Sequence, residues 1–319
     1  MNAGELDGVI IAEDGRSGFT KAVVQACKLY SIPTVGIMDL TFFSPLTPIH
    51  WLDADKAYLT QLEANIVDGC NLNCKGCTHF AGLFKTSEVY PLETFRRDVR
   101  QLSQVCNVAT FFLLGGEPLL LKNLDEYMKI SRQYLKQSDL RIVMNGLLVP
   151  TVEQKILDAI RENNFFVSIS NYPPTAKMID KIKAVLDANK IRHEVRGAIE
   201  DSGGFNVFMT FRSDNNPLKA RAVCCNDGCR FMRDGRIYKC PIDALSFRFA
   251  ERFKIKNYPK ATGVDLYAPN FAALLPMLDG NVEMCHWCSE TVRKIPWTTS
   301  NNPKLEDWLA DPAELQNGQ

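Results

Sequence analysis

The run DGCNLNCKGCTHF at residues 68–80 decides how the rest of the sequence is interpreted. It holds Cys70, Cys74 and Cys77 in a C-x3-C-x2-C spacing, directly after an apolar stretch at residues 62–67 that predicts a β-strand. A loop this short can bring three thiols together. The three thiols can bind an iron–sulfur cluster, or they can form a structural zinc loop with His79 as the fourth ligand. The remaining alternative is a tight turn of core cysteines.

The spacing suits an iron–sulfur cluster in which one iron has no protein ligand. A [4Fe–4S] cube normally takes four thiolates, one for each iron, so a loop with three leaves one iron open. An open iron can chelate the amino and carboxylate groups of S-adenosylmethionine (SAM). Electron transfer into the sulfonium then yields a 5′-deoxyadenosyl radical, while the protein positions the cofactor and excludes water.

Outward from this run, the sequence alternates between apolar strands and amphipathic helices. Strands that are apolar throughout and alternate with helices imply a parallel sheet covered by helices. The predicted fold is therefore α/β, a partial (β/α)6 TIM-like barrel whose site lies at the carboxyl ends of its strands. The predicted strands are 62–67, 108–114, 140–144, 165–170, 191–196 and a sixth at 205–211; the predicted helices are 92–105, 124–135, 152–163 and 176–188.

Several turns follow these strands and should meet the cysteine loop at one edge of the sheet. They are Gly115-Gly116-Glu117-Pro118, Asn145-Gly146 and Ser170-Asn171. Because the carboxyl ends of parallel strands share an edge, these polar groups are predicted to converge there.

The chain is predicted to divide into four parts. Residues 1–57 form a small N-terminal βαβ extension, with strands at 8–14 and 34–39 around a helix at 17–30. Residues 58–203 form the barrel core, 204–300 a cysteine-containing C-terminal domain, and 301–319 a tail.

A second set of cysteines lies in the C-terminal region. The chain has 11 cysteines, and apart from Cys27 and Cys106, which we expect to be small core residues, all lie in clusters. Four thiolates are the number needed for a closed cluster or a structural zinc, and the residues alone do not choose between the two. We predict the ligands as Cys229, Cys240, Cys285 and Cys288, with Cys225 the main rival to Cys229 and Cys224 a weaker one.

The chain resembles the radical SAM superfamily through CNLNCKGC at residues 70–77 and LLGGEP at 113–118. The resemblance implies that Gly115 and Gly116 allow close approach of the methionine end of SAM and that Glu117 binds its amino group. It also implies ribose or carboxylate contacts from Asn145 and from Ser168 or Ser170. One position departs from the family. The residue before the last cysteine is often an aromatic that packs on adenine, but here it is Gly76, and His79 or Phe80 is expected to take that place.

The later cysteines resemble the twitch domain, a short relative of the SPASM extension of radical SAM enzymes. The matching features are the G-x4-C run at residues 235–240, which follows a hairpin signal at Asp234-Gly235, and the C-x2-C at 285–288. The resemblance implies an auxiliary [4Fe–4S] cluster. Because a fully ligated cluster has no open iron, it would pass an electron rather than bind substrate.

The expected function is abstraction of a hydrogen atom by the adenosyl radical, followed by loss of an electron to the auxiliary cluster. The net reaction is a dehydrogenation, which makes the protein a radical SAM oxidoreductase. The resemblance favours a small carbohydrate-like or glycosyl substrate and a reducing partner such as flavodoxin or ferredoxin. The alternatives are modification of a ribosomal peptide and, from another class, a non-catalytic zinc-binding interaction protein.

Composition limits the partners and the location. Lys+Arg and Asp+Glu are both 37, so the formal net charge is zero and there is no basic excess for nucleic acid. No apolar run approaches the roughly 20 residues that cross a bilayer. The first residues lack the basic and apolar parts of a signal peptide, so we expect no membrane partner and a cytoplasmic protein.

Overall fold

The computed structural model describes residues 9–11, 34–37, 49–53, 56–197, 204–210 and 212–314. Its centre is an eight-stranded sheet in the order β12-β11-β10-β4-β5-β6-β7-β8. Strand β10 and the five strands β4 to β8 are parallel neighbours, so the sheet is mostly parallel. These strands are β4 (Ala57–Val67), β5 (Cys106–Gly115), β6 (Asp139–Met144), β7 (Phe166–Ser170), β8 (His193–Arg196), β10 (Arg230–Arg233), β11 (Arg236–Tyr238) and β12 (Val264–Asp265).

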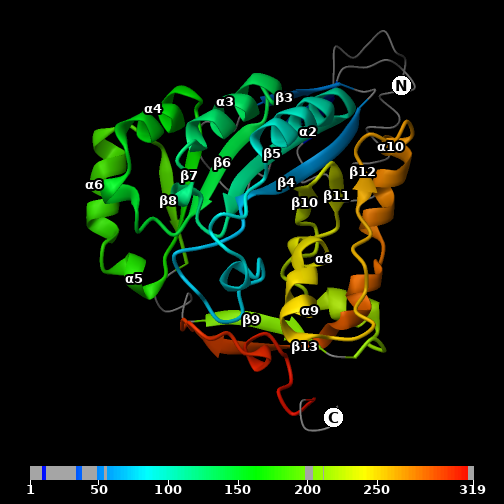
Figure 1. The fold of residues 1–319 in the computed structure, drawn as a ribbon. Helices are drawn as coiled ribbons and strands as arrows, with labels where there is room; N and C mark the ends of the chain where they lie inside the picture. Colours follow the sequence, from blue (N-terminus) through cyan, green and yellow to red (C-terminus); the bar gives the residue numbers. More distant parts are fainter. Residues whose placement is uncertain are drawn as a thin grey trace.

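Helices line one face of the parallel strands (Figure 1). Helix α2 buries Phe95, Val99 and Leu102 at helical spacing, and these residues join the same core as Leu62 and Ile66 of β4. The predicted α/β fold is confirmed, and the predicted helix at residues 92–105 agrees with α2 at both ends. The helices of this layer are α2 (Leu92–Val105), α3 (Leu124–Tyr134), α4 (Gln154–Glu162), α5 (Pro173–Ala176) and α6 (Ile179–Ala188).

The opposite face of the sheet carries polar side chains. Strand β6 alternates, with Leu140 and Ile142 fully buried toward the helices and Arg141 between them half-buried on the other side. The strand register extends this row across the sheet, because Glu63 pairs with Phe112, Phe112 with Arg141, and Arg141 with Phe166.

The predicted sixth barrel strand at residues 205–211 is wrong. Residues Gly204–Met209 form β9, which pairs antiparallel with β13 (Cys288–Pro296) in a separate two-stranded ribbon. The sixth parallel strand is β10, which lies beside β4. An apolar run predicts a strand but not its partner, and the partner of β9 lies about 80 residues later in the chain.

The hairpin signal at Asp234-Gly235 is confirmed. Strands β10 and β11 are antiparallel and are joined by these two residues, whose φ values are 48° and 72°. Positive φ at both central positions is the geometry of a type I′ turn, which glycine favours. The remaining helices of the C-terminal region are short: α7 (Pro217–Ala222), α8 (Pro241–Leu245), α9 (Phe247–Phe253) and α10 (Phe271–Leu274).

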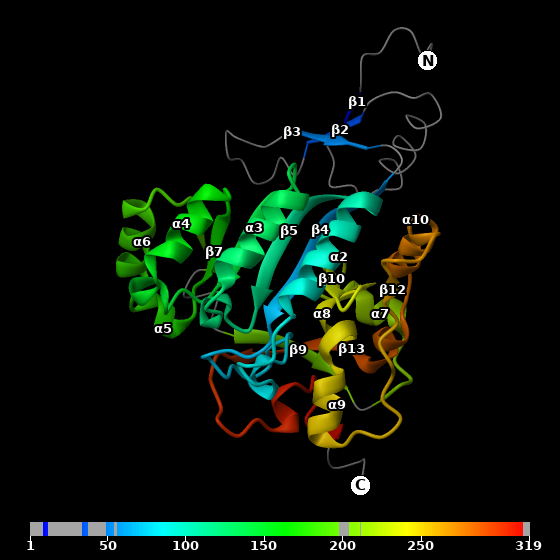
Figure 2. The same cartoon turned by 45° about the horizontal axis from the view of Figure 1, so that its top comes forward.

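A small sheet stands beyond the amino end of β4 (Figure 2). Strands β1 (Val9–Ile11) and β2 (Thr34–Ile37) pair in parallel, as predicted for the two strands of the N-terminal extension. The helix predicted between them and Cys27 lie outside the described residues. Sequence analysis missed β3 (Ile49–Leu52), which pairs antiparallel with β2. The four-part division of the chain stays a prediction, and the main sheet includes strands from both sides of the predicted boundary at residue 204.

The structure contains no helix long and apolar enough to cross a membrane within the described ranges.

A buried ion pair joins the hairpin to the start of the cysteine loop. Arg233 donates from Nη1 and Nη2 to Asp68 at 2.7 and 2.9 Å, and Asp68 is only 2% exposed. We expect Arg233→Met to lower the free energy of unfolding by about 3 kcal/mol, because it leaves an uncompensated buried carboxylate. Urea denaturation measures this loss.

The matched control is Arg212→Met. Arg212 also binds its aspartate, Asp214, through two nitrogens, but both side chains are more than 60% exposed. Its removal should cost less than about 1 kcal/mol. Equal losses for the two variants would contradict the role of burial.

Candidate functional site

The three cysteines of the loop share one small region at the carboxyl end of β4. Burial, and to a smaller extent the charge of the Cys77 thiol, raises the pKa values of the Cys70 and Cys74 thiols to about 12. The sulfur atoms therefore lie within electrostatic reach of one another. Burial also raises the pKa of Cys77, against the effect of backbone N–H groups of residues 79–81 that point at its sulfur. Thiols held this way need a positive partner to ionise, and iron bound by these three residues would supply one.

The glycine turn after β5 is pressed against the start of the cysteine loop. Gly116 donates its N–H to the Val67 carbonyl at 2.9 Å, and Glu117 donates to the Gly69 carbonyl at 3.2 Å. A Cβ atom on Gly116 would lie 2.0 Å from the Gly69 oxygen, so only glycine allows this contact. The predicted convergence of the turn and the loop is therefore present.

The Glu117 carboxylate is fixed between two strand ends. Its Oε2 accepts the Asn145 N–H at 2.8 Å, and its Oε1 accepts the Leu119 N–H at 3.1 Å. Asn145 in turn donates from Nδ2 to the Asn71 side chain at 2.7 Å, inside the cysteine loop. Burial raises the pKa of Glu117 to about 7, although the two N–H groups act in the other direction.

This pKa leads to a prediction about SAM binding. Glu117 must be ionised to attract a cationic amino group, and below pH 7 most of it is neutral. We expect SAM affinity to fall about tenfold between pH 8 and pH 6. Isothermal titration calorimetry at both values measures it. The Glu117→Gln variant should bind weakly at both pH values; an unchanged pH dependence in that variant would show that another group is responsible.

The two serines on β7 have different surroundings. Ser168 is fully buried and donates its hydroxyl to Glu194 of β8 at 2.8 Å. Ser170 lies next to the edge that carries the cysteine loop and hydrogen-bonds to Tyr172. Burial and then the charges of the cysteines raise the pKa of Tyr172, so the hydroxyl that Ser170 contacts lies on the side of the thiols.

The residues expected to replace the missing aromatic are engaged elsewhere. Phe80 is fully buried and stacks on Trp308 with 6.1 Å between ring centroids. His79 contacts Asn65 through Nδ1 at 3.0 Å, and its Nε2 lies 4.0 Å from Glu63. Burial lowers the pKa of His79 to about 4, so it is neutral near pH 7.

Four cysteines of the second set lie together. Burial raises the pKa values of Cys240 and Cys288, and charges on Cys224 and Cys285 would raise both further. Three of the predicted ligands, Cys240, Cys285 and Cys288, are thus brought together, and Cys224 accompanies them. Cys229 lies against β4, where its sulfur accepts a hydrogen bond from Gln61 at 3.3 Å. It also hydrogen-bonds to Glu63, whose pKa burial raises to about 7.

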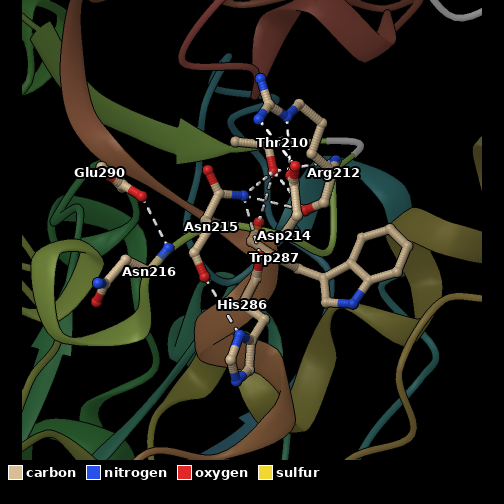
Figure 3. A network of polar contacts seen from close by, with 8 residues as sticks. All are labelled: Thr210, Arg212, Asp214, Asn215, Asn216, His286, Trp287 and Glu290. Atoms are coloured by element: carbon tan, nitrogen blue, oxygen red, sulfur yellow. Dashed lines mark hydrogen bonds and ion pairs between the residues drawn. The ribbon is translucent and has the colours of Figure 1, made fainter.

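A polar network supports the loop that carries Cys285 and Cys288 (Figure 3). Asn215 donates from Nδ2 to the His286 carbonyl at 3.0 Å, and the His286 Nδ1 donates to the Asn215 carbonyl at 3.2 Å. Thr210 bonds to the Trp287 carbonyl, while the Trp287 ring points away from the network. His286 is therefore occupied in holding the loop shape.

Within the described part of the chain, no three His, Cys, Asp or Glu side chains are grouped so that they could hold a single metal ion. The ligands of a [4Fe–4S] cube bind separate irons and do not meet at one point. The donors of both groups are all thiols, which is the chemistry that such a cluster requires.

Sequence reasoning missed the residues that cover the cysteine loop from the C-terminal region. Trp297 and Trp308 both lie against it, and Trp308 donates its indole N–H to the Cys77 carbonyl at 2.9 Å. A pair of tryptophans near the end of a chain carries no local signal of such a contact.

Comparison with known proteins agrees with this geometry. Residues 64–203 match the radical SAM superfamily. Among curated proteins, a GTP 3′,8-cyclase of Pelotomaculum thermopropionicum is 27% identical over 54% of this chain and 57% of its own. A GTP 3′,8-cyclase of Syntrophomonas wolfei is 24% identical over 47% of this chain and 45% of its own. The chain spans about half the length of these curated relatives.

Among solved structures, BtrN in complex with AdoMet and 2-DOIA is 15% identical, with a TM-score of 0.41. The likeness covers 74% of this chain and 96% of that one. The family match implies a [4Fe–4S] cluster and SAM as cofactors. Residues 64–203 of this chain therefore form a radical SAM domain.

Proposed function

We propose that the protein is an enzyme that cleaves SAM reductively and dehydrogenates a polar, carbohydrate-like substrate. The observation that carries the proposal is the contact of the Gly115-Gly116-Glu117 turn with a loop of three mutually close thiols. When bound, the first cluster and SAM would supply an adenosyl radical that takes a hydrogen atom from a substrate C–H bond. The auxiliary cluster would supply an acceptor for the electron that the substrate then loses. Loss of that hydrogen atom, one electron and one proton converts an alcohol to a ketone.

The residues of the chain hold and orient the cofactors. Cys70, Cys74 and Cys77 would bind the first cluster. Glu117 would bind the SAM amino group, and the two backbone N–H groups that donate to its carboxylate fix the position of that carboxylate. Asn145 links this carboxylate to the cysteine loop, so the two parts of the site keep a constant separation.

The polar face of the sheet supports a hydroxyl-bearing substrate. Glu63 and Asn65 on β4, Arg141 on β6, and Glu194 and Arg196 on β8 lie on it. Hydroxyl groups need both donors and acceptors, and this face offers both. We propose Glu63 and Glu194, two carboxylates of this face, as acceptors for the proton.

A purine nucleotide is the second candidate substrate. The relatives named GTP 3′,8-cyclase suggest it, and two arginines of the polar face favour it. Arg141 lies over the Phe166 ring at 5.0 Å, and Arg196 lies over the Phe112 ring at 5.9 Å. Guanidinium groups are suited to binding phosphate.

Hydrogen transfer to the cofactor tests the function. The protein is reconstituted without oxygen, reduced by flavodoxin, ferredoxin or dithionite, and supplied with SAM and a deuterated candidate: an aminocyclitol, a sugar, GTP or a peptide. Deuterium should appear in 5′-deoxyadenosine only with the true substrate class. Absence of 5′-deoxyadenosine from protein that carries iron would refute the enzyme proposal.

For the auxiliary cluster we propose Cys240, Cys285 and Cys288, with Cys224 as the fourth ligand in preference to Cys229. Burial and then the charges of Cys224 and Cys285 raise the pKa values of both Cys240 and Cys288, which supports this set. We expect Cys224→Ser to remove close to half of the bound iron and Cys229→Ser to leave it unchanged. Iron analysis and Mössbauer spectroscopy measure the difference, and the reverse pattern would restore Cys229 to the set.

A further inference from the structure

A segment near the end of the chain lies along the cysteine loop. We name residues 297–308 the C-terminal strap. Thr299 forms an antiparallel bridge with Cys74, and bonds on each side extend it. Lys75 donates its N–H to the Thr298 carbonyl at 3.0 Å, and Ser300 donates to the Asn73 carbonyl at 2.8 Å. The strap therefore adds a short strand to the cysteine loop.

The far end of the strap is also anchored on the loop. The Lys75 ammonium lies 3.0 Å from Asp307, whose side chain is 4% exposed, and Trp308 donates to the Cys77 carbonyl at 2.9 Å. The ribbon before the strap leaves no space at Gly76. A Cβ there would lie 2.5 Å from a methyl group of Val207 and 3.0 Å from one of Ile295. A large residue at position 76 is therefore excluded. The strap and the two-stranded ribbon of β9 and β13 fill the space that its side chain would need.

Trp297 is the residue of the strap with an unsatisfied group. Its indole Nε1 is buried and has no hydrogen-bond partner of standard geometry. Leaving such a donor unpaired costs about 1–3 kcal/mol. The ring stacks on Tyr172, with 5.9 Å between centroids and 18° between planes, so its direction is fixed. The nearby acceptor is the Cys74 sulfur, because Thr299, two residues along the strap, bridges Cys74, and Lys75 donates its N–H to the Thr298 carbonyl.

We propose that Trp297 donates its indole N–H to the Cys74 sulfur when the cluster is bound, and that the strap in this way raises the reduction potential of the SAM-binding cluster. The proposal rests on the proposed function, because it requires a cluster on Cys70, Cys74 and Cys77. A thiolate bound to iron is a stronger hydrogen-bond acceptor than a neutral thiol. Cluster binding would therefore give the unpaired indole N–H of Trp297 a hydrogen-bond partner. Hydrogen bonds to cluster sulfurs favour the reduced, more negative state and are one of the ways in which proteins set the potential. Trp297 is a positioning residue in this scheme.

The test is the reduction potential of the Trp297→Phe variant in the reconstituted full chain. Phenylalanine keeps a ring for Tyr172 to stack on but removes the N–H. The auxiliary cysteines Cys240, Cys285 and Cys288 are replaced with alanine in every sample, so that a single cluster is titrated. Redox titration followed by electron paramagnetic resonance should give a more negative midpoint for Trp297→Phe at equal iron content.

The matched control is Trp308→Phe, which loses a hydrogen bond to a carbonyl rather than to a sulfur. Its midpoint should equal that of the parent protein. An unchanged midpoint in Trp297→Phe, or an equal shift in both variants, overturns the proposal. A parent protein that binds no iron overturns the proposed function and this inference together.

A second measurement needs no substitution at Trp297. Tryptophan is labelled with nitrogen-15, and pulsed electron paramagnetic resonance is recorded on the reduced cluster. We expect a nitrogen-15 coupling that persists in Trp308→Phe. Absence of any such coupling overturns the proposal even if Trp297→Phe fails to fold.

Discussion

Replacing Cys70, Cys74 and Cys77 together with alanine is expected to abolish reductive cleavage of SAM. The three thiols are the only protein ligands that the open-iron site would have, and no single iron can be chelated by SAM once the cluster is gone. Formation of 5′-deoxyadenosine with dithionite as reductant, followed by chromatography, should fall to the level of a sample without protein. The iron content of the protein should fall at the same time to the amount that the auxiliary cluster alone would bind.

Cys106→Ala provides the control for this experiment. Cys106 begins β5 and is 3% exposed, so its removal tests the loss of a buried thiol outside both cysteine groups. We expect full iron content and full SAM cleavage in that variant. Continued cleavage in the triple variant would show that the site lies elsewhere in the chain.

Gly116→Ala is expected to have the second largest effect. The added Cβ would lie 2.0 Å from the Gly69 oxygen and 2.6 Å from the Cys70 nitrogen, and both are backbone atoms that cannot rotate away. We expect the free energy of unfolding to fall by about 3 kcal/mol or more, and the turn to move away from the first cysteine. Chemical denaturation measures the first effect, and SAM binding measures the second.

Gly82→Ala is the matched substitution, in the short helix η1 (Ala81–Leu83) that follows the cysteine loop. Its Cβ would meet Asn73 at 3.6 Å, which is an ordinary contact. The free energy of unfolding of Gly82→Ala should differ from that of the parent protein by less than about 1 kcal/mol, and SAM binding should be unchanged. If Gly116→Ala bound SAM as tightly as Gly82→Ala, the close approach of the turn would have no role in the site.

The central part of the fold could be predicted because its signals are local. The helix at residues 92–105 was predicted at both ends, and the predicted strands at 62–67 and 108–114 lie inside β4 and β5. The convergence of Glu117 and Asn145 on the cysteine loop follows from a simple rule, that parallel strands end at one edge.

The remainder depends on partners that are distant in sequence. Strand β9 has the same apolar composition as a barrel strand, yet it pairs with β13, and the place expected for it is taken by β10. The choice between Cys224 and Cys229 depends on which way a short loop turns, and spacing does not determine this. The contact of Trp297 with Cys74 joins residues more than 200 positions apart, so nothing near either residue predicts it.

The long sequence separation between the cysteine loop and the strap also orders events in time. Trp308 and Cys77 are 231 residues apart. On a ribosome that adds about 5–20 residues per second, roughly 10–50 seconds separate the synthesis of the two. The cysteine loop is therefore made well before its cover exists. During that interval the loop lacks the added strand, the ion pair and the indole hydrogen bond that the strap supplies.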